Sequence, residues 1–162
     1  MKNLWIAFQQ SLKLPQKNAV FTLNRIGMDT TVFYLFILLA IVSLPELMNQ
    51  IIADDTAGFN VHIIFILIYF FIFYYLMLLL IVFIALSIIA YISLIISRGL
   101  KRKLHYSILW KMSAFATTIP LIIYTIISFF HSLNYLYLTL ATIFIFFILI
   151  KIILIYPKRR DK

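Results

Sequence analysis

The longest apolar stretch of the chain, residues 61–97, most strongly limits what the chain can fold into. It contains no Lys, Arg, Asp, Glu, Gly or Pro. A transmembrane helix needs about 20 mostly apolar residues to cross a hydrocarbon core of ~30 Å. Because lipid offers no hydrogen-bond partner to exposed backbone amides, we expect this stretch to be a membrane-embedded helix.

The composition agrees with that expectation. Hydrophobic residues make up 65% of the 162 residues and charged residues 12%, whereas soluble domains have roughly 45–50% and about 25%. These values exclude a soluble enzyme, a soluble binding module and a disordered tail. The chain has no cysteine, which also excludes disulfide scaffolds, thiolate metal sites and cysteine nucleophiles.

Three further stretches are long and apolar enough to cross a membrane. The chain is therefore predicted to be an all-α integral membrane protein with four transmembrane helices. The predicted spans are 30–48, 61–97, 109–130 and 134–156. Pro120 lies inside the third span and is expected to kink it, with the neighbouring threonines satisfying part of the freed backbone.

The second span is unusually long. As one helix, residues 61–97 would measure about 55 Å at 1.5 Å per residue, so such a helix would tilt strongly or continue past the bilayer. Two crossings would need a tight turn, which no Gly, Pro, Asn or charged pair supplies. Residues alone leave open whether the helix is continuous or broken. The dense aromatic run from Tyr69 to Tyr75 is interpreted as lipid-facing and core side chains.

The positions of the basic residues favour four spans over five. With four spans, all 14 Lys and Arg residues lie on one side of the membrane, which the positive-inside rule makes cytoplasmic. Glu46, Asp54 and Asp55 then lie outside, and both termini are cytoplasmic. The basic residues are Lys2, Lys13, Lys17 and Arg25, then Arg98, Lys101, Arg102, Lys103 and Lys111, and finally Lys151, Lys158, Arg159, Arg160 and Lys162.

The first 28 residues form a predicted amphipathic segment on the cytoplasmic surface. Its apolar residues Leu4, Trp5, Phe8 and Leu12 recur at helical spacing, as in a helix lying in the headgroup region. The alternative is an ordinary flexible leader, and no signal peptide is indicated because the apolar run starts too late. The chain thus divides into the interfacial segment 1–28, the four-helix domain 29–157 and the basic tail 158–162.

Small residues at helical spacing predict which spans pack together. They form one stripe at the end of the second span and another at the start of the third, so we expect these ends to pair as an antiparallel hairpin. The alternative is that the hydroxyls line a polar pathway. The two stripes are Ser87, Ala90, Ser93 and Ser97, and Ser113, Ala114, Thr117 and Thr118.

Two basic clusters next to the spans are predicted to contact anionic lipid headgroups. Polybasic segments at a membrane surface gain about 1 kcal/mol per residue. No soluble part is large enough to present a basic patch to nucleic acid, so membrane lipids are the expected partners. The predicted contact residues are Lys101, Arg102 and Lys103 in the loop, and Lys158, Arg159 and Arg160 in the tail.

Few residues could carry chemistry. His62 and His131 with an external acid could form a Zn²⁺ or Mn²⁺ site, but no HxxxH or HExxH spacing supports one. No acidic or basic residue lies in the middle of a span, and the nearest exception, Lys151, is close to the predicted cytoplasmic end, where its side chain can reach the headgroups. No catalytic residue, metal or cofactor is therefore predicted, and the shortage of charges disfavours pumps and secondary transporters.

Two groups of residues resemble a known family. The first is Phe8, Ser11-Leu12-x-x-Pro15, Arg25-Ile26-Gly27 and Val32-Phe33-Tyr34-Leu35. The second is Lys101-Arg102-Lys103-Leu104-x-Tyr106-x-x-Leu109-Trp110-Lys111, followed by Ala116-x-Thr118-x-Pro120. Together they resemble the uncharacterised bacterial membrane family filed as domain of unknown function 1189.

The resemblance implies a setting but no chemistry. It implies the cytoplasmic membrane of a low-GC Gram-positive bacterium, and it supplies no catalytic residue. Some relatives are named for maltodextrin utilisation, and the family is distantly similar to the Yip-type proteins of membrane trafficking. Longer members have a sizeable external segment after the first span, which is reduced here to about residues 49–60.

Three functions are compatible with these observations. The first is a non-enzymatic interaction or scaffold protein that binds another membrane protein or a second copy of itself. The second is a component or regulator of solute transport, for example of sugars such as maltodextrins. The third is a membrane enzyme using His62 or His131. The small packing stripes and the scarcity of charged residues within the spans favour the first.

Overall fold

A computed structural model describes residues 2–57, 63–129 and 135–157 of the chain. These residues form helices and connecting turns, without strands. The elements are α1 (Lys2–Ser11), α2 (Lys17–Arg25), α3 (Met28–Ala57), α4 (Ile63–Tyr69), the π-helical turn η1 (Phe70–Tyr75), α5 (Leu76–Gly99), α6 (Tyr106–Ala116), α7 (Thr118–Ser128) and α8 (Tyr135–Ile155).

Four segments are long and apolar enough to cross a membrane, which confirms the predicted number of spans. They are Met28–Ile52, Ile63–Gly99, Tyr106–Ser128 and Leu136–Ile155. The first helix extends beyond the predicted 30–48 at both ends and passes through Pro45. The third is two helices rather than one. It is interrupted at Thr117, three residues before Pro120, because the proline ring cannot accommodate the carbonyl of residue 116 in a regular helix.

The second span is continuous from Ile63 to Gly99, which answers the question that the residues left open. The span is α-helical in α4 and α5 and π-helical between them in η1, where the aromatic residues gather. Rings four residues apart contact each other, as in Phe70–Tyr74 with centroids 5.1 Å apart and Phe71–Tyr75 at 5.6 Å. Phe70 is buried, and the Tyr75 hydroxyl donates a 2.8 Å hydrogen bond to the carbonyl of Phe36 in α3.

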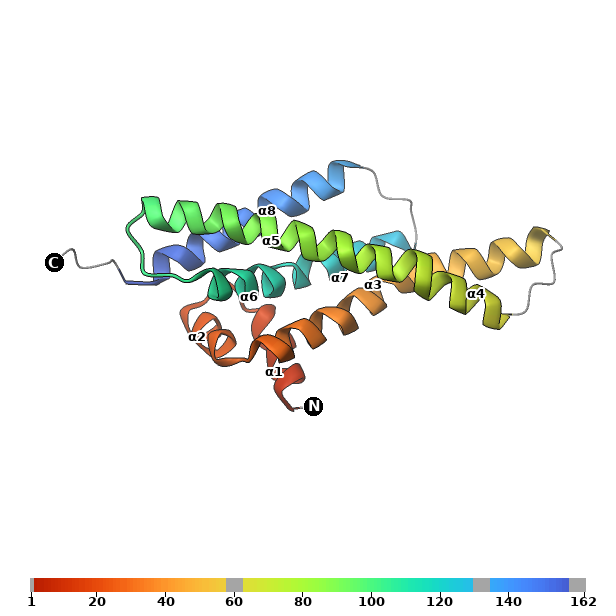
Figure 1. Cartoon of the computed structure of the whole chain (residues 1–162), viewed down its shortest axis with the longest axis horizontal. Helices are drawn as coiled ribbons and strands as arrows, with labels where there is room; N and C mark the ends of the chain where they lie inside the picture. The colour runs from red at the N-terminus through yellow and green to blue at the C-terminus, as the bar shows by residue number, and fades with distance from the viewer. Residues whose placement is uncertain (1, 58–62, 130–134, 158–162) are drawn as a thin grey trace.

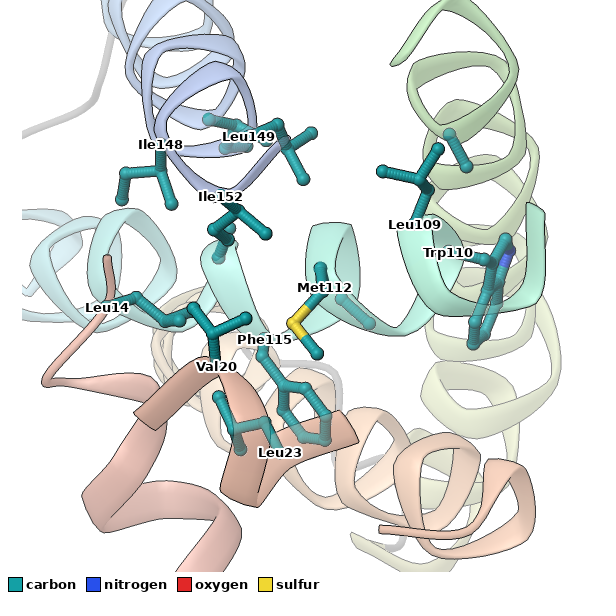
Figure 2. Packing of buried hydrophobic residues seen from close by; sticks show 14 of the residues in the cluster. Leu14, Val20, Leu23, Leu109, Trp110, Met112, Phe115, Ile148, Leu149 and Ile152 are labelled. Carbon is teal, nitrogen blue, oxygen red and sulfur yellow. The ribbon is translucent and has the colours of Figure 1, made fainter. Parts of the chain in front are cut away.

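α6 lies at the centre of the molecule. Every residue from Leu109 to Ala116 is buried, and α6 packs against α1, α2, α3, α5, α7 and α8. In Figure 2, Met112 and Phe115 point from α6 toward Val20 and Leu23 of α2. Such a central position requires small side chains, which Ser113, Ala114 and Ala116 supply.

The expected pairing of the second and third spans is present. α5 packs more extensively against α6 than against any other element, and its buried residues are Leu86, Ala90, Ser93 and Ser97. Trp110 of α6 also contacts α5 at this interface. Its indole nitrogen donates a 3.3 Å hydrogen bond to the Ser87 hydroxyl. Its ring also lies 5.7 Å from that of Phe83.

The spanning helices differ in length and in how far they are covered. Figure 1 shows α3 and α4 side by side at one end of the molecule, beyond the ends of α7 and α8. α1 and α2 lie toward the opposite end, where α5 and α8 finish. Of the most apolar 18 residues of the second span, 22% are buried, against 56% for the third span.

We predict that Ala90→Leu destabilises the bundle whereas Ala85→Leu does not. Ala90 is fully buried on the packed stripe of α5, while Ala85 is exposed on the same helix. Overpacking a tight interface costs about 1–3 kcal/mol. The thermal midpoint of the purified protein in detergent should fall for A90L only, and equal midpoints for the two variants would contradict the close approach of α5 and α6.

Candidate functional site

A buried lysine fastens α2 to the centre of the bundle. Lys111 of α6 is 8% exposed, and its ammonium donates hydrogen bonds to the carbonyls of Asn24 at 2.7 Å and Ile26 at 2.8 Å. The last carbonyls of a helix lack partners within that helix and attract cations. The sequence placed Lys111 among the loop charges, but its side chain caps the C-terminal end of α2.

Three hydroxyl groups, hydrogen-bonded in a row, hold α1 against α3 and α7 in the same region. The Tyr34 hydroxyl of α3 is hydrogen-bonded to Thr118 of α7 at 2.8 Å and to Ser11 at the end of α1 at 3.3 Å. All three side chains are buried. A buried hydroxyl without a partner is costly, so the three groups depend on one another. These hydrogen bonds hold α1, α3 and α7 in fixed relative positions.

The two groups of residues quoted for the family resemblance meet at this junction. Ser11 and Tyr34 belong to the first group, and Lys111 and Thr118 belong to the second. Ala7, Ala19 and other residues of α1 and α2 share one hydrophobic core with the spanning helices. α1 and α2 therefore pack as part of the bundle, and Ser11, Tyr34, Lys111 and Thr118 hold these helices together.

The α1 pattern has both a buried face and an outward face. Trp5 and Leu12 are exposed, whereas Leu4 and Phe8 are half-buried against the core. The smaller residues Ala7 and Ser11 make the fully buried face.

The predicted lipid-contact residues of the loop have different surroundings. Lys101 and Lys103 are exposed. Arg102 is half-buried, and its guanidinium donates a hydrogen bond to the carbonyl of Tyr156 just beyond the end of α8. Arg102 therefore joins the ends of α5 and α8. The tail residues Lys158, Arg159 and Arg160 lie outside the described residues.

The loop that carries these residues is folded tightly onto the end of α5. The backbone amide of Arg102 donates to the carbonyl of Ser97 at 2.9 Å. Lys101 has a φ of 51°, the left-handed position after a helix that glycine usually occupies. This geometry turns the chain sharply at the end of α5 and directs it toward the start of α6.

The histidine hypothesis cannot be placed in the structure. His62 and His131 lie outside the described residues, as do the side chains of Asp54 and Asp55. Within residues 2–57, 63–129 and 135–157, no group of three His, Asp or Glu residues is close enough to hold a metal ion.

All four spanning segments line a cavity of about 650 Å³. Its walls come from α3, the η1 and α5 part of the second span, the α6–α7 break and α8. Most of the lining is aliphatic, and none of the lining residues in the described part of the chain is charged. The volume lies within the range of roughly 300–1,000 Å³ that is usual for ligand pockets.

Three tyrosines gather at one part of this cavity. The rings of Tyr124 in α7 and Tyr137 in α8 lie 5.8 Å apart, and the Tyr137 hydroxyl donates to the carbonyl of Pro120. Tyr74 of η1 lines the same cavity. Sequence reasoning missed this group because its members come from three separate helices. The π-helical turn that carries Tyr74 has no sequence signal of its own.

The comparisons with known proteins identify a family. A family model described as "Protein of unknown function (DUF1189)" matches residues 46–156. The chain belongs to this family. The match includes the second group of quoted residues, from Lys101 to Pro120, and leaves out the first group. No curated protein and no solved structure matches the chain, so DUF1189 membership supplies no activity, substrate or partner.

We predict that Lys111→Met loosens α2 without unfolding the bundle. The change keeps an apolar side chain of similar length but leaves the carbonyls of Asn24 and Ile26 without their donor. Losing such bonds costs about 1–3 kcal/mol, or roughly a tenfold to hundredfold change in local opening. Hydrogen–deuterium exchange should therefore accelerate in residues 17–26 and stay unchanged in residues 145–153.

Lys103→Met is the matched control, because Lys103 is exposed. It should leave the exchange of residues 17–26 unchanged. Equal protection of these residues in K111M and in the unmodified protein would contradict the role assigned to the buried ammonium.

Proposed function

We propose that the chain is a non-enzymatic interaction protein of the bacterial cytoplasmic membrane, binding another membrane protein or a second copy of itself. The observation that carries the proposal is the length of the second span, which exceeds the thickness of the hydrocarbon core of a bilayer. A continuous helix of 37 residues measures about 55 Å. Even at a tilt of about 40°, the upper end of the usual range, it would extend roughly 42 Å along the membrane normal, beyond a hydrocarbon core of ~30 Å.

The excess length falls on α4, where the helix is least covered. Ile63, Phe65 and Ile68 are all more than half exposed, and α4 packs mainly against α3 and η1 among the described elements. At the other end of the span, α6 and α8 cover α5. Apolar side chains outside the hydrocarbon core need a protein surface to cover them. The binding site for the partner is therefore assigned to α4.

The proposed orientation places α4 on the external side. Residues 13–25, 98–103 and 151–157, which hold most of the described basic residues, lie toward one end of the molecule in Figure 1. The C-terminal part of α3, the helix that contains Glu46, and α4 lie toward the other end. By the positive-inside rule the basic end is cytoplasmic, and the exposed Trp5 then lies at headgroup depth on that side. Lys101 and Lys103 would contact anionic lipid there, together with Lys158, Arg159 and Arg160 of the tail.

A role in solute transport, such as the uptake of sugars, is the second proposal. It is supported by the helix break at Thr117 and by the cavity that all four spans line. Uptake of maltodextrins and other solutes by a deletion strain separates the two proposals, since an interaction role outside transport leaves uptake unchanged.

We predict that single cysteines report this orientation. The natural chain has none, so a membrane-impermeant maleimide added to intact cells labels only the introduced residue. Asp55→Cys and His131→Cys should be labelled from outside, and Lys103→Cys should be labelled only after lysis. External labelling of K103C in intact cells would contradict four spans with cytoplasmic termini.

We also predict that a photoreactive benzoylphenylalanine at Phe65 captures a protein partner in living cells. Leu140 is the matched control, because it is similarly exposed but lies on α8, whose 21 residues match the hydrocarbon core at about 31 Å. Position 65 should give a discrete protein adduct and position 140 only lipid adducts. An adduct twice the mass of the chain means a second copy. Lipid adducts alone at position 65 would contradict the proposal.

A further inference from the structure

The cavity among the four spans has the properties of a binding site for a lipid-like molecule. It has a volume of about 650 Å³. Its lining runs along α8 from Tyr137 to Ile145, a rise of about 12 Å along the helix axis. Aliphatic residues make up most of this length, so a hydrocarbon chain is the chemistry that the cavity best accommodates.

The cavity has a polar end. Tyr74, Tyr124 and Tyr137 lie there, with rings from η1, α7 and α8. Tyr137 is already bonded to the carbonyl of Pro120. The hydroxyls of Tyr74 and Tyr124 form no hydrogen bond with another described residue, so each can both donate to and accept from a ligand. Unused hydroxyls in an otherwise apolar site set the orientation of a bound molecule.

The electrostatics of the site select against a charged headgroup. Among the described residues, no Lys, Arg, His, Asp or Glu lines the cavity. A phosphate or carboxylate would meet no cation among these described residues, so its charge would not be compensated there.

We propose that this cavity binds an uncharged lipid that carries a hydroxyl group. Its hydroxyl hydrogen-bonds with Tyr74 and Tyr124, and its hydrocarbon chain lies between α5, α7 and α8 toward Ile89 and Ile145. A diacylglycerol and a long-chain alcohol share this chemistry. The inference goes beyond the interaction role proposed above, because the cavity is separate from the exposed face of α4.

The test uses the full chain in phosphatidylcholine nanodiscs with trace photoactivatable lipids. The probes are a diacylglycerol, a long-chain alcohol and a phosphatidic acid, each with a diazirine in the hydrocarbon chain. Mass spectrometry then maps the labelled residues. At least one uncharged probe should label cavity residues of α7 and α8, and which of them does so identifies the lipid class. Phosphatidic acid should label only residues on the outer surface.

Two variants of α8 test the position of the site. Ala141 lines the cavity, whereas Ile143 lies outside the lining and is 60% exposed. Ala141→Trp should reduce labelling of α7 by about tenfold by filling the space, while Ile143→Trp should leave it unchanged. Undiminished labelling of α7 in A141W would overturn the proposal, as would equal labelling of the cavity by phosphatidic acid.

The double variant Y74F/Y124F tests the headgroup and does not depend on a bulky substitution. It removes only two hydroxyls that form no hydrogen bond with another described residue. Losing these hydrogen bonds should lower the preference for the alcohol over its methyl ether by about fivefold. An unchanged preference would overturn the assignment of the tyrosines to a hydroxyl group.

Discussion

The close packing of other helices around α6 is the constraint on which the rest of the structure depends. Between membrane helices there is no hydrophobic driving force comparable to that in water, so small side chains and short contacts hold the helices together. α6 is buried from Leu109 to Ala116 and contacts six other helices. The chain reaches α6 through the segment between Gly99 and Tyr106, and it leaves α6 at Thr117, where Pro120 interrupts the helix.

The polar groups around α6 complete this arrangement. Lys111 satisfies the end of α2, the hydroxyls of Ser11, Tyr34 and Thr118 join three helices, and Arg102 joins α5 to the end of α8. Each bond lies between elements distant in sequence. In the sequence, several of these residues have the pattern of surface charges or of motif residues. In the structure they hold helices together. Ser11, Tyr34, Lys111 and Thr118, which belong to the two groups of residues that resemble the family, hold helices in place in this chain.

Much of the fold could be predicted because membrane insertion imposes simple rules on sequence. Apolar length predicted the four spans, and Pro120 predicted a kink in the third span, which the structure shows as a break into two helices. The small residues of the second and third spans predicted the pairing of α5 with α6. These features depend on composition within one segment or on a pattern with helical period, which a sequence displays directly.

The remaining features depend on contacts between segments. The burial of Lys111 could not be predicted, since a lysine at a helix start normally extends to the headgroups. The capping carbonyls belong to residues 24 and 26, far away in the chain. The tyrosine group at the cavity was missed for the same reason, and the π-helical turn places Tyr74 in a register that a regular helix would not give.

The structure thus combines a tightly packed end with a loosely covered one. At the end with α1 and α2, Lys111, Arg102 and the hydroxyls of Ser11, Tyr34 and Thr118 join helices. At the other end, α4 leaves large apolar side chains exposed. The proposed association with a partner rests on this difference.

Native mass spectrometry of the protein, extracted from its own membrane with surrounding lipid, tests the central claim most directly. A protein that works by binding a partner should be recovered as a complex of fixed stoichiometry, either with a second copy or with one other membrane protein. Recovery only as a single chain with variable numbers of bound lipids would contradict the claim.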